Sequence, residues 1–154
     1  MKYPVRPVDQ NKILSEPFTY TANFYDLLRS TSQTGAIQIH SDSDFEIHKL
    51  SANVMSDSAA INSVFYTDIG RGVHAPGLYV LMTENTIEAR LSDIATPLVN
   101  VFGTAAEPFI LKQPKTIRAN SVLSIQLSNL YTGQDFDSVE LCFIGKKKSL
   151  RVAG

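Results

Sequence analysis

The stretch of sequence that decides the fold is Ser121-Val122-Leu123-Ser124-Ile125-Gln126-Leu127-Ser128-Asn129-Leu130. Large apolar side chains occupy every second position here, and polar side chains fill the positions between them. Successive side chains of a β-strand point to opposite faces of the sheet. The alternation therefore predicts a strand that turns Leu123, Ile125 and Leu127 toward a core.

The same period of two begins at Ala36. Ile37, Ile39, Phe45 and Ile47 share one parity, and polar or charged residues share the other, which predicts one or two strands with a turn or bulge at residues 41–44. Further strands are predicted at 63–69, 78–83, 86–91, 98–102 and 139–143. About eight short strands without crossover helices predict an all-β fold, an antiparallel β-sandwich of the jelly-roll kind.

The first third of the chain differs from the rest. Residues 1–35 contain three prolines and little sustained periodicity, and we expect an extended N-terminal arm there, with a short strand at 13–20 and a helical turn at 24–28. Residues 36–148 are predicted to form the β-sandwich domain, and residues 149–154 a C-terminal tail. The last strand is expected to end at Gly145. A long connection stiffened by Pro108 and Pro114 is expected to precede the strand at 121–130.

Composition places the chain among ordinary globular proteins. It has 154 residues, of which 44% are hydrophobic and 19% charged, and a formal net charge of −1. This balance gives no global attraction to nucleic acid, which makes nucleic acid an unlikely partner. A single cysteine, Cys142, excludes an intrachain disulfide framework. We find no signal peptide and no apolar run long enough to span a bilayer, so we expect a soluble protein made in the cytoplasm, with no membrane partner.

No catalytic constellation stands out, and we expect neither enzymatic activity nor a cofactor. The polar parity of residues 40–48 brings His40, Asp42, Asp44, Glu46 and His48 onto one strand face, a set that could bind a metal ion. A solvent-facing strand surface has the same alternation, and we favour that interpretation over a metal site. Cys142 lies within an alternating strand, which favours a structural thiol over a reactive one.

The candidate partner-binding residues lie in three segments. An aromatic group in the arm either packs on its own domain or lies across a partner. A glycine-rich loop supplies two further candidates, and a basic segment near the end of the chain contacts phosphates, contacts an acidic protein patch, or is solvated. The residues are Phe18, Tyr20, Phe24 and Tyr25 in the arm, Arg71 and His74 in the loop, and Lys146, Lys147, Lys148 and Arg151 in the basic segment.

Residues 98–123 read Leu-Val-Asn-Val-Phe-Gly-Thr-Ala-Ala-Glu-Pro-Phe-Ile-Leu-Lys-Gln-Pro-Lys-Thr-Ile-Arg-Ala-Asn-Ser-Val-Leu. Together with residues 42–50, 127–130 and 139–147, this segment resembles small β-sandwich virion proteins of tailed bacteriophages, which often serve as capsid cement or decoration proteins. The resemblance covers roughly residues 36–148.

The resemblance implies a structural protein of the virion capsid, assembled in the host cytoplasm. Its partners would be the major capsid protein and itself, as a dimer or trimer, and its contacts would stabilise the shell by multivalency. An alternative is a neck, tail or fibre component whose β-sandwich binds a ligand or a carbohydrate. The absence of tryptophan from the chain weighs against a sugar-binding platform.

Overall fold

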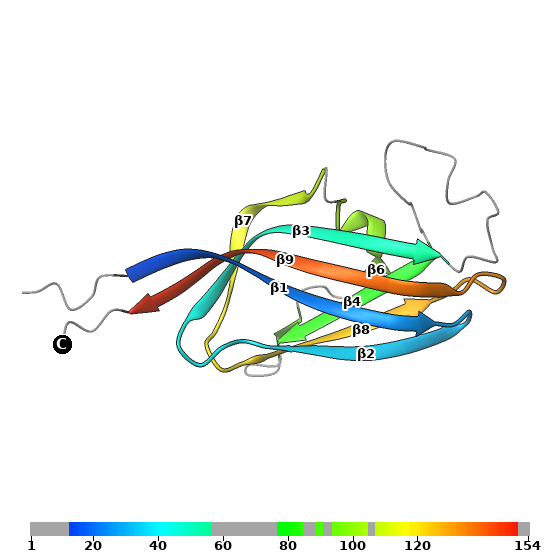
Figure 1. Cartoon of the computed structure of the whole chain (residues 1–154), viewed down its shortest axis with the longest axis horizontal. Coiled ribbons are helices and arrows are strands. Elements are labelled where there is room, and N and C mark those ends of the chain that lie inside the picture. The colour runs from blue at the N-terminus through cyan, green and yellow to red at the C-terminus, as the bar shows by residue number, and fades with distance from the viewer. Residues whose placement is uncertain (1–12, 57–76, 85–88, 91–93, 105–106, 151–154) are drawn as a thin grey trace, which may run out of the picture.

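The chain folds into two β-sheets that face each other across a common core (Figure 1). The structure is a computed structural model, and it describes residues 13–56, 77–84, 89–90, 94–104 and 107–150. Within these residues it contains nine β-strands, one short 3-10 helix and no α-helix. The predicted all-β class and the antiparallel pairing are confirmed.

Each sheet draws its strands from the whole length of the described chain. In spatial order, sheet A contains β1 (Ile13–Leu27), β9 (Phe136–Leu150), β3 (Asp44–Ser56) and β7 (Phe109–Ile117). Sheet B contains β2 (Thr31–Gln38), β8 (Val122–Asn129), β4 (Leu78–Glu84) and β5 (Ala89–Arg90), and β6 (Thr96–Pro97) also pairs with β4. The helix η1 (Leu98–Asn100) follows β6 directly.

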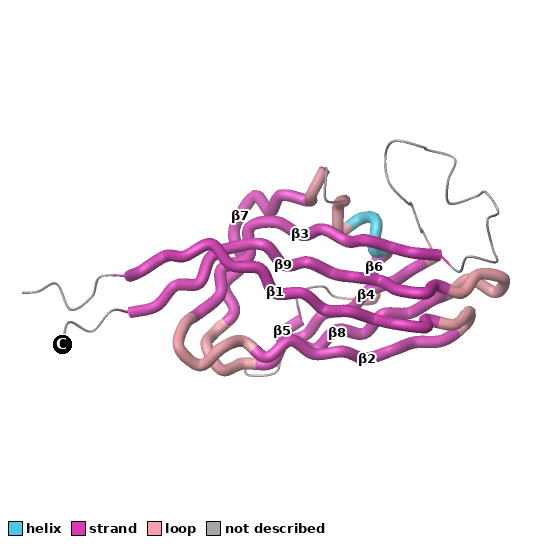
Figure 2. The backbone as a smooth tube through the Cα atoms, viewed as in Figure 1, coloured by secondary structure: helices cyan, strands magenta, loops and turns pink. Residues whose placement is uncertain are grey.

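The strand pairs are nested along the sequence. β1 pairs with β9, β2 with β8, β3 with β7, and β4 with β5, all of them antiparallel. The pairs β3–β9 and β4–β8 then join these ribbons into the two sheets. The tube in Figure 2 shows the sheets stacked face to face, with β1 and β2 side by side along one edge of the sandwich.

The alternating stretches form the core as predicted. Leu123, Ile125 and Leu127 on β8 are almost completely buried. The four apolar residues between 37 and 47 are buried as well, on β2, β3 and the turn between these strands. These side chains interdigitate between the sheets, and their burial is the main favourable contribution to folding.

The expected N-terminal arm is wrong for residues 13–35, which belong to the two sheets, although the strand expected at 13–20 is confirmed as part of β1. Tyr20, Ala22 and Phe24 are buried at every second position of β1, so these aromatic residues complete their own core. Pro17 is tolerated because β1 is an edge strand, which needs backbone hydrogen bonds on one side only. The helical turn expected at 24–28 is also wrong. Asp26 has a φ of 52°, and this kink moves the buried parity from Phe24 to Leu27. Residues 1–12 lie outside the described part.

Three further boundaries differ from the prediction. β9 continues past Gly145 to Leu150, because β1 offers a partner for its whole length, so Ser149 and Leu150 are not part of a tail. Residues 98–100 form η1 instead of a strand. The expected connection after Gly103 contains β7. The strand predicted at 63–69 lies outside the described residues, and of the strand predicted at 86–91 only Ala89–Arg90 is described, as β5.

Candidate functional site

Four of the seven large apolar side chains that are exposed in the described residues lie at one end of the sandwich. Tyr25 on β1 and Met55 on β3 pair with the same β9 residue, Ser138, and flank it on the outer face of sheet A. Tyr25 is 63% exposed and Met55 is 62% exposed, so neither the ring of Tyr25 nor the thioether of Met55 packs in the core. Large apolar side chains that are exposed together mark a contact surface more often than an ordinary stretch of protein exterior.

Two leucines extend this surface around the end of the molecule. Leu28 in the β1–β2 turn is 53% exposed, and Leu130 at the start of the β8–β9 loop is 58% exposed. A hydrogen bond of 3.0 Å from the backbone N–H of Ser30 to the carbonyl oxygen of Tyr131 holds the two turns together. We call Tyr25, Leu28, Met55 and Leu130 the distal end, because they lie where β1, β3 and β8 end and β9 begins, at the end of the sandwich opposite Ile13 and Leu150.

A buried asparagine fixes the loops of the distal end. Asn129 is fully buried, and its side-chain N–H groups donate to the carbonyl oxygens of Leu27 at 3.2 Å and Gln134 at 2.8 Å. Its side-chain oxygen accepts a hydrogen bond of 3.0 Å from the backbone N–H of Tyr131. The loop between β8 and β9 is therefore tied to the end of β1, and the surface is preorganised for binding.

An ion pair reinforces the same end. The Arg29 guanidinium contacts both carboxylate oxygens of Asp135, at 3.0 and 3.1 Å, and the backbone N–H of Arg29 also donates to Asp135. These hydrogen bonds to the Arg29 side chain and backbone favour the ionised carboxylate and hold the pKa of Asp135 below its ordinary value. The pair links the β1–β2 turn to the β8–β9 loop.

The opposite end of the sandwich holds Lys146, Lys147 and Lys148 of the basic segment, which lie within β9. The amino group of Lys147 lies 2.8 Å from Nδ1 of His40, 3.6 Å from an Asp42 oxygen and 4.5 Å from the centre of the Phe18 ring. An ammonium group only donates, so Nδ1 of His40 accepts this hydrogen bond. The Lys147 side chain is 15% exposed, and its charged amino group interacts with Asp42 of the same chain.

The lysines on either side of Lys147 differ from each other. Lys148 forms an ion pair with Glu46, whose carboxylate also contacts His48 at 2.7 Å. The Lys148 contact, followed by the His48 contact, lowers the pKa of Glu46 despite its partial burial. Lys146 is exposed and has no ion pair with any residue of the described part. Of the three lysines, Lys146 is therefore the one most available to a partner.

The residues of the polar strand face contact other groups of the chain. His40 and Asp42 contact Lys147, while the Asp44 carboxylate accepts a hydrogen bond of 2.8 Å from the backbone N–H of Ala119. Within the described ranges, no group of three His, Cys, Asp or Glu side chains is placed to hold a metal ion.

The other predicted partner residues have different positions. Tyr20 and Phe24 are buried, so their prediction as partner contacts is corrected: Tyr20 packs on Phe45 with ring centres 4.7 Å apart. Phe18 is half-buried beneath Lys147, and Tyr25 is the exposed member of the aromatic group. Arg71, His74 and Arg151 lie outside the described residues.

Cys142 lies on the outer face of β9, partly covered by its neighbours. Its sulfur lies 4.0 Å from the hydroxyl of Thr21 on β1, and its thiol donates to a Glu140 carboxylate oxygen at 3.5 Å. Burial, more than any other influence, raises the pKa of the Cys142 thiol. A thiol with a raised pKa is a poor nucleophile at neutral pH, because the thiolate is the reactive form.

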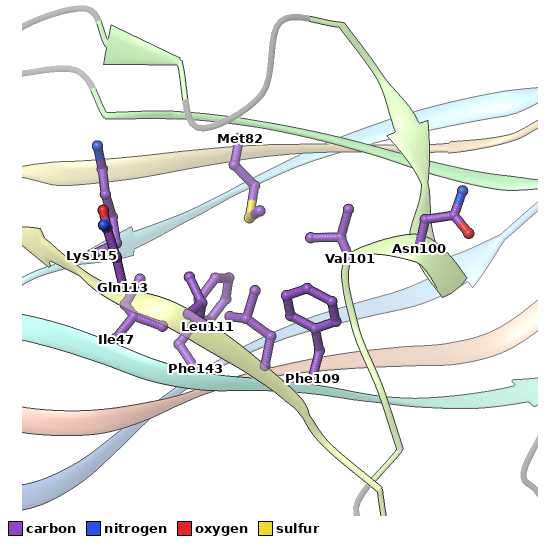
Figure 3. Close-up of a pocket in the computed structure, with 10 residues that line it drawn as sticks. Ile47, Met82, Asn100, Val101, Phe109, Leu111, Gln113, Lys115 and Phe143 are labelled. Carbon is purple, nitrogen blue, oxygen red and sulfur yellow. The ribbon is translucent and has the colours of Figure 1, made fainter.

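A cleft opens between the two sheets on the side where β7 and β4 lie (Figure 3). Its volume is about 320 Å³, and Ile47, Leu50 and Phe143 of sheet A, Met82 of β4 and Val101 after η1 line it. β7 supplies the remaining wall with Phe109, Leu111, Gln113 and Lys115, and Asn100 lies at the rim. Ligand pockets in proteins have this character, a mostly apolar lining with a few polar groups.

The cleft could not be predicted from the sequence, because the sequence pattern predicts a connection and not a strand at residues 109–117. The signal was present as an alternation: Phe109, Leu111, Gln113 and Lys115 face the cleft, while Ile110 and Lys112 do not line it. Pro114 obscured this alternation, since proline is unusual within a strand. β7 accommodates it because β7 is an edge strand with a broken register.

Comparisons with known proteins assign no family to the chain. No protein-family model matches it, and no curated protein matches it. In the described part of the structure, no helix has the length and apolar character needed to cross a membrane.

Proposed function

We propose that this chain is a non-enzymatic jelly-roll protein of a tailed-bacteriophage particle, and that it binds the major capsid protein as a cement or decoration protein. The nested pairing of β1 with β9, β2 with β8, β3 with β7, and β4 with β5 supports the jelly-roll part of this proposal. Jelly rolls place eight strands in two sheets of four, and viral capsid proteins use this architecture repeatedly. In this interpretation β6 is a short addition beside β4.

The observation that carries the binding role is the distal end. Its four exposed apolar residues come from three separate parts of the chain, and the Asn129 hydrogen bonds and the Arg29–Asp135 pair hold the surrounding loops in place. Burial of preorganised apolar side chains stabilises a protein interface without the entropic cost of ordering it. Repetition of one such modest contact on a symmetric shell would add up to strong overall attachment.

In this proposal the partner contacts are made by the edges and ends of the sandwich and not by the extended N-terminal arm that the sequence suggested. Residues 13–35 complete the chain's own sheets, so the partner contacts are assigned to the distal end, with Lys146 as a second, polar candidate. Tyr25 is the residue that the sequence analysis and the distal end share.

A binding assay with purified phage heads that lack this protein tests the proposal. Labelled full-length protein is expected to co-sediment with the heads and to raise the temperature at which they release DNA. The double variant Tyr25→Lys/Met55→Lys is expected to bind about tenfold more weakly or worse, because two lysines would be desolvated at the contact.

The matched control is Thr19→Lys/Thr116→Lys, which adds the same charges to exposed positions of β1 and β7 in the same sheet, away from the distal end. Equal loss of binding in both double variants would show a general charge effect and remove the distal end as the contact. No binding of the native protein to heads would overturn the capsid role.

The copy number of the protein per particle distinguishes a shell protein from a component of the neck, tail or fibre. Quantitative mass spectrometry of purified particles is expected to find hundreds of copies for a shell protein, whereas about six or twelve copies would place the chain at the neck or tail. The second result would retain the virion role and replace the cement role.

A further inference from the structure

The cleft beside β7 arises from an irregular pairing register between β7 and β3 in sheet A. Ile110 of β7 pairs with Lys49 of β3, and Lys115 pairs with Ile47, so residues 111–114 of β7 lie opposite the single residue His48. This irregularity frees the middle of β7 from the β3 ladder, and Pro114 has no N–H group to lose there. The side chains of Leu111 and Gln113 form the cleft wall at this point.

The facing side of the cleft is supplied by β4 of sheet B. β6 pairs with β4 only at Tyr79 and Val80, and β5 pairs with β4 only at Thr83 and Glu84. Met82 lies between these two short pairings, and its side chain projects into the cleft from the β4 side (Figure 3). The cleft therefore lies between β7 of sheet A and β4 of sheet B, and apolar side chains of both sheets line it.

The lining of the cleft has a single charged residue, and its two ends differ in chemical character. Of the ten lining residues only Lys115 is charged, and it lies beside Gln113 at one end of the cleft, while Val101 and Phe109 lie toward the other (Figure 3). Lys115 is exposed and has no ion pair with another residue in the described ranges. An apolar channel with a cation and an amide at one end is complementary to a chain-like molecule with an anionic head.

We propose that the cleft binds an unbranched alkyl carboxylate of medium length, with its carboxylate at Lys115 and Gln113 and its alkyl chain along Leu111, Phe143, Met82 and Val101. The cavity volume of about 320 Å³ lies at the lower end of the range for ligand pockets, roughly 300–1,000 Å³, which selects a medium chain over a long one. This site shares no residue with the distal end, and it stands independently of the capsid role.

The native protein supplies the first test. Protein labelled with ¹³C at its methionine methyl groups is titrated with decanoate and followed by NMR. The Met82 methyl signal is expected to shift and saturate with a dissociation constant of about 10–300 µM, while the signal of Met55, exposed on the outer face of sheet A, stays in place. Absence of a saturable Met82 shift would overturn the proposal.

Two matched pairs of variants then locate the alkyl chain and the head group. Leu111→Trp fills the cleft and is expected to abolish binding, whereas Ile110→Trp, at the exposed neighbouring position outside the lining, leaves it unchanged. Lys115→Glu is expected to weaken decanoate binding about three- to tenfold and to spare decanol binding, whereas Lys112→Glu changes neither.

These variants also define what would contradict the site. Binding that survives Leu111→Trp in a protein with a native circular dichroism spectrum would place the ligand elsewhere. Equal weakening by Lys112→Glu and Lys115→Glu would remove Lys115 as the head-group partner. If Leu111→Trp fails to fold, the Met82 titration and the lysine pair still decide the question.

Discussion

The backbone carbonyl of Glu46 packs against Gly145, in the space that a Cβ atom would occupy on any other residue. Gly145 pairs with Ile47 of β3 on one side and with Phe18 of β1 on the other, next to the point where β3 loses register. The close approach of two central strands at this point therefore depends on the absence of a side chain at position 145.

Gly145→Ala is expected to destabilise the fold by about 2–3 kcal/mol, because a methyl group would push apart two paired strands in the interior of sheet A. Chemical denaturation in urea, followed by circular dichroism, measures the change. Gly133→Ala is the control: no atom lies within 4 Å of the added methyl group, and its midpoint should remain that of the native protein. Equal midpoints for both variants would contradict the packing at Gly145.

Asn129→Ala is expected to cost about 2–4 kcal/mol of stability, because the carbonyl oxygens of Leu27 and Gln134 and the N–H group of Tyr131 would lose their partner in a buried site. Thermal unfolding measures the loss, with Asn23→Ala on the exposed face of β1 as the neutral control. A loss confined to the distal end would appear as rapid amide exchange at Tyr131 while the core of β8 stays protected.

Acid is expected to weaken the fold through its paired carboxylates. The pKa values of Asp135 and Glu46 are lowered from ordinary values of 3.8 and 4.5 in the folded chain, so both groups stabilise it while ionised. This contribution is complete above the unfolded-state pKa and is lost as the pH falls through the folded-state pKa. The melting temperature should therefore fall as the pH drops below about 4.5.

Asp135→Asn isolates one of these contributions. At neutral pH the variant is expected to melt below the native protein, and the difference should shrink as the pH falls through the lowered folded-state pKa of Asp135, because the native carboxylate then becomes protonated. Asp137→Asn, at an exposed neighbouring position, should follow the native curve. A constant difference between Asp135→Asn and the native protein at all pH values would contradict an ionic origin.

Cys142 is expected to react slowly with a disulfide reagent such as DTNB at neutral pH. Burial raises its pKa and covers part of the sulfur, so the reaction should be about tenfold slower, or more, than that of free cysteine. Urea should bring the rate to that of an unfolded thiol. Labelling of the native protein at the free-cysteine rate would show that the outer face of β9 opens readily.

The parts of the fold that could be predicted from the sequence are those in which local alternation and final burial agree. β8 alternates strictly, and its three apolar residues are buried between the sheets. The turn at residues 41–44 and the inward parity of Ile37 to Ile47 follow from the same physical rule, since one face of each strand must leave water. The distal end could be anticipated only in part, through Tyr25.

Kinks and edge positions explain why β1 and β7 could not be predicted as strands over their full length. β1 was interpreted as an arm because Pro17 and the change of parity at Asp26 interrupt its pattern. For β7 the sequence predicts a connection, because Pro108 lies just before it and Pro114 within it. Both strands are edges of sheet A, where a proline removes no necessary hydrogen bond, and a sequence pattern does not tell an edge strand from a loop.

By itself, then, the sequence determined that the chain forms β-strands with one buried face, because side-chain parity is a local property of an extended backbone. Only the tertiary structure decided that Ile13–Leu27 pairs with Phe136–Leu150, that Lys147 and Lys148 have carboxylate partners within the chain, and that a cleft opens beside β7. These features join residues far apart along the chain, and their stability depends on which strands become neighbours, a choice made by the packing of both sheets together.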